Sequence, residues 1–442
     1  MVPSHALWLR HRKEVDLLTD SISVQTPGAA STQFNKGLHF FSGALEPAEV
    51  KRLGWNLLRE DLSLPSAALY EEKLAHNLEW MRRFAVEYGA KLAPHGKTTM
   101  SPQLFARQLQ HGAWGITLAT AQQTLVAWQH GVRRVLMANQ LVGKENMRIV
   151  SSLIEDPGFE YFCLVDSADQ IHQLGSFFSA RGQRLPVLVE LGVTGGRTGV
   201  RDEEQLKSVL DALSGWSGAL LLSGVEIYEG VLADEAAIRA FLQRAIDVTR
   251  RLASDKRFQR APVLISGAGS AWYDVVAEAF SAAGFESGIE IVLRPGCYIT
   301  HDVGAYREAQ SRILSSNPVA RQMHSGLVPA LHVWAYVQSR PEPGTAIIGM
   351  GKRDAAFDAG FPVPALHFRP GDSLPKAAPA HWTITKMMDQ HAFLHLSAQD
   401  DLRVGDMLAF DISHPCLTFD KWRAMPILNE QYEVVDVIQT WF

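Results

Sequence analysis

The segment APHGKTTMSP, residues 93–102, places a lysine in an unusual position. Lys97 follows an apolar, strand-like run and stands among small and hydroxyl residues, whereas most lysines lie on solvated helix surfaces. If this lysine is partly desolvated, its pKa is lowered and the free amine can act as a nucleophile or a base. From these ten residues alone, the simpler interpretation is a surface lysine capped by Thr98 or Thr99.

Two glycine-containing segments further along the chain predict an anion site. SGAGS (266–270) leads into a helix that starts near Trp272, and PGCY (295–298) follows the next apolar run. Glycines let backbone N–H groups approach a phosphate, and the dipole of a following helix adds to the attraction. Ordinary turns contain the same residues, so the argument depends on where these segments lie in the fold.

A third chemical signal is the pair formed by His414 and Cys416 in SHPCLTFDKW. On an extended strand, residues two apart face the same way, so one metal ion could bind both. Imidazole and thiolate together favour Zn²⁺, and two protein ligands leave positions for water and substrate, as in catalytic sites. A histidine beside a buried cysteine in an ordinary β domain would show the same pattern.

The composition predicts a soluble, cytoplasmic globular protein. The chain has 442 residues, a formal net charge of −5 and three widely spaced cysteines, which favours a reducing compartment over a disulfide framework. The charges are mixed along the chain, so we expect no nucleic-acid partner. The N-terminus lacks the apolar run of a signal peptide, and no stretch is long enough to span a membrane.

The elements that must position these residues alternate regularly between residues 61 and 308. Eight apolar, β-rich runs read as buried parallel strands, at residues 90–96, 115–120, 134–141, 161–167, 185–192, 220–230, 262–269 and 289–297. Amphipathic stretches between them read as helices, among them residues 120–131, 167–182, 201–215, 234–255 and 271–284. We therefore expect a (β/α)8 barrel, with a doubly wound sheet as the alternative. Cys163, within the fourth run, is expected to be a core residue.

The pattern changes on both sides of this region. From residue 309 to 442 the apolar residues alternate with a period of two and are separated by Gly and Pro turns, which predicts a mostly antiparallel β domain. Residues 1–60 form an N-terminal extension with one predicted helix over 46–61, able to pack on either domain.

In such barrels the active site lies at the C-terminal ends of the strands, and the unusual segments fall there. Lys97 ends the first strand, Tyr228 ends the sixth, and the segments 266–270 and 295–298 end the seventh and eighth. The loops after strands seven and eight often hold phosphate. A lysine that faces a phosphate site predicts a Schiff base with pyridoxal 5'-phosphate (PLP).

Several segments, in order, resemble one family. PHGKTTMSPQL (94–104) resembles the PH-x-KT segment of fold-type III PLP enzymes, the alanine-racemase-like barrels, and within them the D-serine dehydratase and D-threonine aldolase group. ELGVTGGRTGV (190–200) looks like the family's D-x-G-x-x-R-x-G segment, with Glu190 where an aspartate is common. DQHAFL (389–394) is similar to EEH-x-x-L, and residues 404–422 are similar to the family's GD…P-x-H-x-C-x-T ending.

The resemblance implies roles for individual residues. Lys97 would carry PLP, Arg197 would lie near the ring hydroxyl, and Tyr228 would lie near the ring. The phosphate would be held by Gly267, Ala268, Gly269, Ser270, Cys297 and Tyr298. His95 would orient the lysine or line the ring face, although a packed histidine at a strand end is an equal alternative. The resemblance also favours Zn²⁺ on His414 and Cys416, and a homodimer whose β domain completes the neighbouring site.

These expectations predict a PLP- and zinc-dependent lyase that acts on D-3-hydroxy amino acids such as D-serine or D-threonine. Lys97 would remove the Cα proton, the metal would assist loss of the β-hydroxyl, and the products would be a 2-oxo acid and ammonia. A D-threonine aldolase, which yields glycine and an aldehyde, is the first alternative. A metal-free PLP racemase and a non-catalytic PLP carrier are further alternatives.

Four polar residues near these segments stay open. His301 and Asp302 could touch substrate or make a turn, and Asp358 could reach the site or lie in a solvated loop. His391 is not expected to be a metal ligand.

Overall fold

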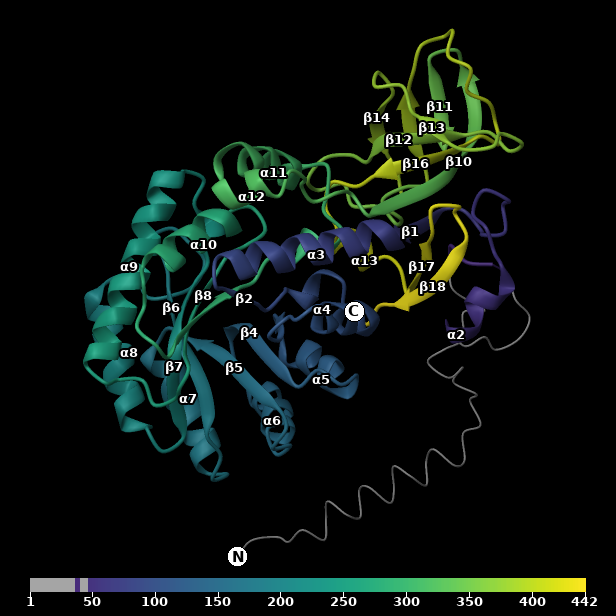
Figure 1. Cartoon of the computed structure of the whole chain (residues 1–442). Helices are drawn as coiled ribbons and strands as arrows, with labels where there is room; N and C mark the ends of the chain where they lie inside the picture. Colours follow the sequence, from purple (N-terminus) through teal and green to yellow (C-terminus); the bar gives the residue numbers. More distant parts are fainter. Residues whose placement is uncertain (1–35, 40–46) are drawn as a thin grey trace, which may run out of the picture.

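The structure is a computed structural model of the 442-residue chain, and it describes residues 36–39 and 47–442. These residues form two parts that lie against each other (Figure 1). One is a barrel surrounded by helices, and the other is a set of antiparallel strands. Helix α3 (Glu71–Glu87) leads from the antiparallel part to the barrel.

Eight parallel strands form the barrel, in the order β2-β9-β8-β7-β6-β5-β4-β3. They are β2 (Lys91–Leu92), β3 (Ile116–Leu118), β4 (Arg134–Gln140), β5 (Glu160–Val165), β6 (Leu185–Leu191), β7 (Leu220–Ile227), β8 (Val263–Gly267) and β9 (Ile289–Leu293). A parallel bridge between His95 and Thr117 joins the two ends of this sheet. The predicted (β/α)8 barrel and its eight strands are therefore confirmed.

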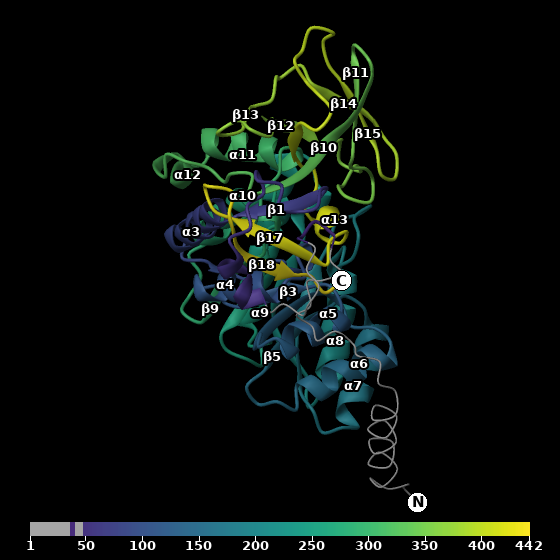
Figure 2. The ribbon, with the colours of Figure 1, turned by 90° about the vertical axis from the view of Figure 1, so that its right-hand side faces the viewer.

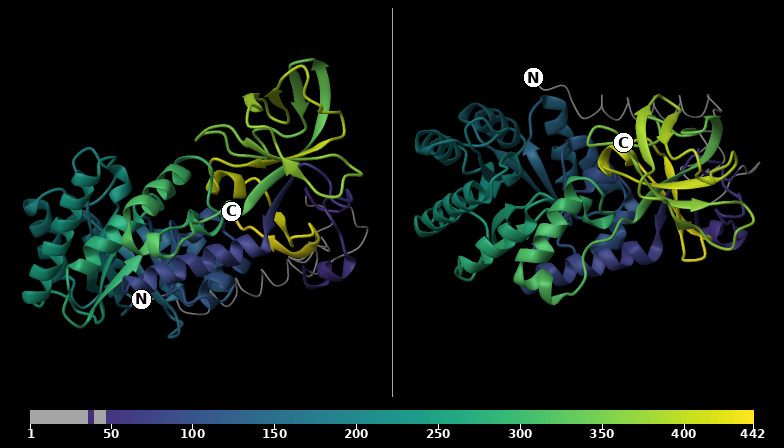
Figure 3. Two further views of the ribbon diagram at one scale, coloured as in Figure 1. Left: turned by 45° about the horizontal axis from the view of Figure 1, so that its top comes forward. Right: turned by 90° about the horizontal axis from the view of Figure 1, so that it is seen from above.

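Helices cover the outside of the barrel, as the views in Figures 1 and 3 show. They are α4 (Pro102–Gln110), α5 (Ala121–Gln129), α6 (Lys144–Leu153), α7 (Ala168–Ser179), α8 (Glu203–Gly215), α9 (Glu235–Ser254), α10 (Tyr273–Ala282), α11 (Ala305–Ser316) and α12 (Pro318–Gln322). Local sequence sets their ends. Gln123 N donates to Thr120 Oγ1 over 3.1 Å at the start of α5, and Gly131, with φ 90°, follows its end.

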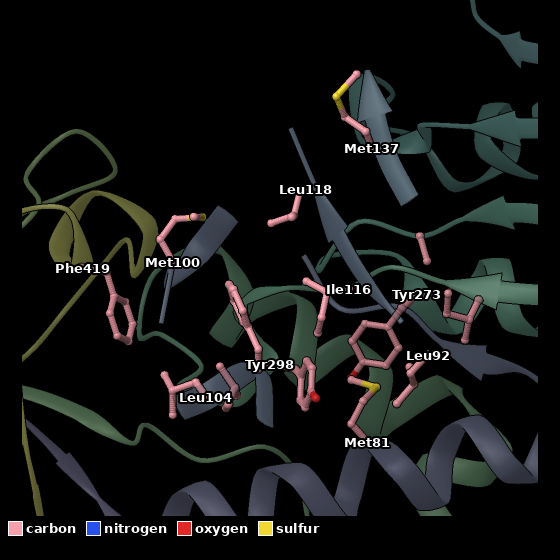
Figure 4. Close-up of a cluster of buried hydrophobic side chains, with 14 of the residues drawn as sticks. Met81, Leu92, Met100, Leu104, Ile116, Leu118, Met137, Tyr273, Tyr298 and Phe419 are labelled. Atoms are coloured by element: carbon pink, nitrogen blue, oxygen red, sulfur yellow. The ribbon is translucent and has the colours of Figure 1, made fainter. Parts of the chain in front are cut away.

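Successive side chains along a barrel strand point alternately into two apolar layers. Leu136, Phe162 and Leu264 belong to a cluster inside the barrel, whereas Val135 and Met137, on either side of Leu136, pack with the surrounding helices. Cys163 is fully buried in the outer layer, as expected for a core cysteine. Figure 4 shows part of this outer core, in which Phe419 from the C-terminal region joins Met100 and Leu104 from the segment after β2, along with Met81, Leu92, Ile116, Leu118, Met137, Tyr273 and Tyr298.

The antiparallel part confirms the predicted C-terminal β domain. Its strands are β10 (Leu331–Glu342), β11 (Thr345–Ile348), β12 (Val363–Phe368), β13 (Lys376–Ala377), β14 (Thr383–Met387), β15 (Ala392–His395), β16 (Met407–Asp411), β17 (Ala424–Leu428) and β18 (Val434–Gln439). One further strand of this sheet comes from far earlier in the chain: β1 (Ser66–Tyr70) pairs antiparallel with β10 and parallel with β17. The predicted boundary at residue 61 places β1 with the barrel, and the strand pairing corrects this.

The predicted helix over 46–61 is also corrected. Helix α2 (Pro47–Val50) and the 3-10 turn η1 (Lys51–Leu53) end at Gly54, whose φ of 62° is left-handed. Trp55 and Leu57 then bury their side chains in a cluster with residues of β1, β10 and β18. The described part of the N-terminal extension therefore packs on the antiparallel part.

Three short helical turns lie where the two parts meet. They are η2 (Gly96–Thr98), η4 (Cys297–Ile299) and α13 (Cys416–Phe419). Figure 2 shows α13 between β10 of the antiparallel part and β3 of the barrel. Among the described residues, no helix is long and apolar enough to cross a membrane.

Candidate active site

A cavity of about 170 Å³ lies at the C-terminal ends of the barrel strands, beside α13. Nine of the predicted site residues line it: His95, Lys97, Arg197, Tyr228, Gly269, Ser270, Cys297, His414 and Cys416. The structure therefore brings the lysine, part of the anion segments and the His414/Cys416 pair together within one chain. Gly267, Ala268 and Tyr298 are not among the lining residues.

Lys97 stands on the turn η2, which is held tightly from two sides. A Cβ atom added to Gly296 would lie 2.6 Å from His95 Cβ and 2.8 Å from Thr98 Oγ1, so only glycine fits there. Lys97 itself is exposed. The expectation that burial activates this amine is therefore wrong for the isolated chain, although the backbone that carries the lysine is fixed.

His95 is held by a buried arginine that the sequence analysis did not single out. Arg294 Nη1 lies 3.0 Å from His95 Nε2, and the same guanidinium donates to Ser266 Oγ and to Ile227 O. Arginine only donates hydrogen bonds, so His95 Nε2 must accept and the ring proton lies on Nδ1. Burial, together with the positive charge of Arg294, lowers the pKa of His95 well below its usual value.

The Nδ1 atom of His95 is buried and has no hydrogen-bond partner among the described residues. A buried donor without a partner costs about 1–3 kcal/mol. The His95 residue also lines the cavity, so this donor lies at its edge.

The far side of Arg294 forms a buried ion pair with Glu226 on β7. Both side chains are almost completely inaccessible to solvent. Burial raises the pKa of Glu226 to about 8, and the Arg294 charge opposes that rise. One buried arginine thus links the polar interior of the barrel to the histidine next to Lys97.

The predicted anion segments already bind a negatively charged side chain. The N–H groups of Ala268 and Gly269 donate to the Glu229 carboxylate over 3.1 and 2.6 Å. Burial raises the pKa of Glu229, and these amide hydrogen bonds oppose the rise. Ala268 has a φ of 78°. The glycine-rich turn therefore does present N–H groups to an anion, but the Glu229 carboxylate occupies two of them.

Ser270 closes the other side of this anion region. Its Oγ atom accepts hydrogen bonds from the N–H groups of Gly296 and Cys297 over 3.2 and 3.1 Å. The side chain of Tyr298 does not line the cavity. Its Oη atom instead lies 3.4 Å from Gln108 Nε2. The groups that face the cavity are therefore Gly269, Ser270, Gly296 and Cys297.

Arg197 and Tyr228 also line the cavity, and their side chains contact each other. The Arg197 guanidinium lies 5.1 Å from the centroid of the Tyr228 ring, within the range of a cation–π contact. Burial raises the pKa of Tyr228. The side chains of Arg197 and Lys97 thus line the same cavity as the anion region.

His414 and Cys416 lie at the start of α13 rather than on an extended strand. Pro415 between them has helical φ and ψ angles of −57° and −47°, which corrects the strand geometry expected for the pair. Their side chains still interact. A hydrogen bond from Cys297, with help from His414, lowers the pKa of the Cys416 thiol to about 4, and Cys416 raises the pKa of His414 to about 9.

Asp358 orients His414. Its Oδ2 atom lies 2.8 Å from His414 Nδ1, so Nε2 is the ring nitrogen left for a metal ion. Asp358 thus does more than lie in a solvated loop. In the part of the chain that the structure describes, no three His, Cys, Asp or Glu side chains are grouped to hold a metal ion. A metal ion here would rest on two protein ligands, with Asp358 behind one of them.

Three other polar residues fall outside the cavity. Asp302 Oδ1 accepts hydrogen bonds from the N–H groups of Gly304 and Tyr306, so it caps the turn before α11. His301 is buried beside it, and His391 is exposed before β15.

Six lining residues were not predicted to belong to the site: Thr98, Ala119, Ala138, Asn139, Arg294 and Tyr306. Gly296 lies in the predicted anion segment 295–298. One of the six had a signal in the sequence. Arg294 is a charged residue directly after the apolar run 289–293, at a strand end that points to the site.

Two family models match successive parts of the described chain. The family described as "Alanine racemase, N-terminal domain" matches residues 70–286, and "Putative serine dehydratase domain" matches residues 330–428. A D-threonine aldolase from Arthrobacter sp is 24% identical over 83% of this chain and 89% of its own length. A D-threo-3-hydroxyaspartate dehydratase from Delftia sp. (strain HT23) is 24% identical over 55% of this chain and 62% of its own length.

Solved structures show the same fold. That of D-threonine aldolase from Filomicrobium marinum has a TM-score of 0.72 at 24% identity and covers 89% of this chain and 98% of its own. A metal-free cysteine-to-alanine mutant of D-threo-3-hydroxyaspartate dehydratase has a TM-score of 0.69 at 21% identity and covers 88% of this chain and 99% of its own. The chain therefore belongs to the fold-type III PLP enzymes, with an alanine racemase N-terminal domain followed by a D-serine dehydratase-like domain.

Proposed function

We propose that this chain is a PLP- and zinc-dependent lyase that eliminates the β-hydroxyl of a D-3-hydroxy amino acid, releasing a 2-oxo acid and ammonia. The observation that supports this most directly is the meeting of Lys97 with His414 and Cys416 in one cavity. The Lys97 amine would then act on the Cα proton, and a metal ion on His414 and Cys416 would act on the β-oxygen of the same small substrate.

The cavity residues suit PLP. Bound PLP would supply an electron sink for the electrons left at Cα when a proton is removed. Lys97 would hold it covalently, and Gly269, Ser270, Gly296 and Cys297 would line the space for its phosphate. The N–H group at His95 Nδ1, buried and without a partner, would gain an acceptor.

The chain's own residues would handle the protons and charges. The Lys97 amine is exposed to the cavity and can take the proton from Cα once it is free. Arg197 is a guanidinium that lines the cavity and would bind an anionic oxygen. His95 stays neutral, because Arg294 holds its Nε2 atom as an acceptor.

The metal pair would serve the leaving group. His414 would bind through Nε2, since Asp358 occupies Nδ1, and Cys416 would bind as a thiolate. A Zn²⁺ ion there would act as a Lewis acid on the β-oxygen. Two protein ligands leave open positions for water and substrate.

Retro-aldol cleavage is the second candidate, and one observation favours it. The match to D-threonine aldolase extends over 83% of this chain, whereas the match to the dehydratase extends over 55%. The imidazole–thiolate pair, in place of a histidine and a carboxylate, favours elimination. A homodimer whose β domain completes the neighbouring site remains a prediction.

A panel of D- and L-3-hydroxy amino acids with the purified holoenzyme tests the reaction. We expect ammonia and a 2-oxo acid from D-serine, D-threonine or D-threo-3-hydroxyaspartate, and loss of this activity after chelation of the metal. Glycine and an aldehyde as the products would instead establish the aldolase. Full activity in metal-free protein would exclude a catalytic role for zinc.

Lys97→Ala tests the cofactor assignment. The variant should lose the yellow absorbance of covalently bound PLP together with turnover. Lys144→Ala, at an exposed position at the start of α6, is the matched control and should keep both. Retained colour in Lys97→Ala would show that another lysine carries the cofactor.

A further inference from the structure

Two of the three cysteines of the chain meet in the cavity, although they lie on different parts of the fold. Cys297 Sγ lies 3.8 Å from Cys416 Sγ, across a sequence separation of 119 residues. Cys297 belongs to η4 after the last barrel strand, and Cys416 begins α13. The third, Cys163, is fully buried in β5.

The thiol of Cys297 is not needed for the anion region. At that position it is the backbone N–H group that faces Ser270 Oγ, and any residue would supply it. The side chain points instead to Cys416, whose sulfur also lies 3.4 Å from Thr98 Oγ1. Both sulfurs line the cavity, so a small solute that enters it can reach either one.

We propose that Cys297 and Cys416 form a reversible intramolecular disulfide when the enzyme meets a hydroperoxide. The sulfurs lie 3.8 Å apart, close to van der Waals contact, and a disulfide requires the two side chains to move until the S–S distance is about 2.05 Å. No second chain is needed for the reaction.

The reaction proceeds in two balanced steps. One thiol sulfur attacks the peroxide, an S–O bond forms, the O–O bond breaks, and the leaving hydroxide takes up the thiol proton as water. The second sulfur then attacks the first, the S–S bond forms, and the S–O oxygen leaves as a second water with the remaining proton. Both cysteines are oxidised, and the peroxide is reduced.

The disulfide would have two consequences in the cavity. It would tie η4, next to the anion region, to α13, which carries His414. It would also remove the thiolate of Cys416 from metal binding, so oxidation and zinc binding would exclude each other. This second consequence rests on the proposed function, whereas the disulfide itself does not.

Peptide mapping tests the disulfide directly. The purified PLP-loaded enzyme, freed of metal by a chelator, is treated with hydrogen peroxide, its free thiols are alkylated, and it is digested with trypsin without reduction. The cysteines fall in separate tryptic peptides, residues 149–181, 261–307 and 404–421. We expect peptides 261–307 and 404–421 to be joined, peptide 149–181 to be alkylated, and dithiothreitol to restore both thiols.

The opposite result would be equally clear. Overoxidation of Cys416 while Cys297 remains a free thiol, or cross-links only between chains, would overturn the proposal. Cys163→Ala is the matched control and should still form the cross-link. Cys297→Ser should not form it, and peroxide should instead convert Cys416 to a sulfinic acid that dithiothreitol does not reverse.

Oxidation in the presence and absence of zinc tests the disulfide separately from the proposed function. Zinc added before peroxide should slow the loss of the two thiols, and chelation should hasten it. A disulfide that forms at the same rate with and without zinc would support the thiol pair while counting against Cys416 as a metal ligand.

Discussion

Arg294 Nη1 lies 3.0 Å from His95 Nε2, and Nη2 of the same side chain forms an ion pair with Glu226. One buried guanidinium therefore connects β7, and the end of β9, to the turn that carries Lys97. This contact fixes the proton of His95 on Nδ1 and turns that N–H group into an unsatisfied donor at the cavity. The position of the site therefore depends on an ion pair inside the barrel.

Removal of this arginine should destabilise the protein strongly. In Arg294→Met the Glu226 carboxyl loses its partner, so it must either stay charged without a counterion or take up a proton. Loss of one partner of a buried ion pair typically lowers the free energy of unfolding by about 3–5 kcal/mol. The free energy of unfolding, measured by urea denaturation, should fall by this order. The double variant Arg294→Met/Glu226→Gln should lose less stability than Arg294→Met, because no unpaired carboxylate remains.

Arg239→Met provides the control for that series. Arg239 forms half-exposed pairs with Glu235 and Glu278 on the barrel's outer surface, where such pairs contribute about 1 kcal/mol or less. Equal losses in Arg294→Met and Arg239→Met would show that the buried network does not matter for stability.

Gly296 is the second point at which the lysine turn is held. In Gly296→Ala the new Cβ would lie 2.6 Å from His95 Cβ and 2.9 Å from the His95 carbonyl oxygen, so the turn must move. Such overpacking typically costs about 1–3 kcal/mol. We expect weaker binding of PLP to the apoenzyme, measured by absorbance titration, as well as a lower unfolding midpoint.

The same substitution at Gly218 isolates the steric cause. No heavy atom lies within 4 Å of a Cβ built there, and its backbone is not left-handed. Gly218→Ala should bind PLP as the unchanged protein does. Unaltered PLP affinity in Gly296→Ala would show that the turn has room that the structure does not show.

The barrel could be predicted from the sequence because its strands are buried on both faces, so each is a near-continuous apolar run bounded by polar turns. In the run around Leu136, for example, Leu136 points into the barrel, Val135 and Met137 point outward, and all three are apolar. β1 could not be placed in the same way. It pairs with β10 and β17, and a buried five-residue segment contains no information about partners so far along the chain.

The site was predictable in part for a similar reason. Strand ends collect Lys97, Tyr228 and the anion segments, because parallel strands end at one rim. Side-chain partners were not predictable. Nothing local shows that Glu229 accepts the N–H groups of Ala268 and Gly269, or that Lys97 is exposed. Both depend on how loops from different strands pack.

Asp358 should control the affinity of the metal pair. It accepts the Nδ1 proton of His414, and loss of such an orienting carboxylate typically weakens metal binding 10–100-fold. Asp358→Ala should therefore bind Zn²⁺ more weakly in competition with a chromogenic chelator. Asp211→Ala, which removes an exposed carboxylate on α8, should not. Equal zinc affinity in the two variants would remove Asp358 from the site.

His301 should make stability depend on pH. Burial, with help from Arg307, lowers its pKa to about 4, compared with about 6.5 in the unfolded chain. Between these values the unfolded state binds a proton that the folded state does not. The free energy of unfolding should therefore fall as the pH drops from about 6.5 to about 4, by up to about 3 kcal/mol from this residue.

His301→Asn removes this titration while it keeps a residue that tolerates the left-handed φ of 50°. The difference in stability between wild type and variant, from urea unfolding at a series of pH values, should change with a slope of about one proton below pH 6.5. His324→Asn is the matched control, because His324 also has a left-handed backbone, with φ 55°, but is exposed. Its stability should depend on pH as that of the wild type does, and the same result for His301→Asn would show that His301 has the same pKa in the folded and unfolded states.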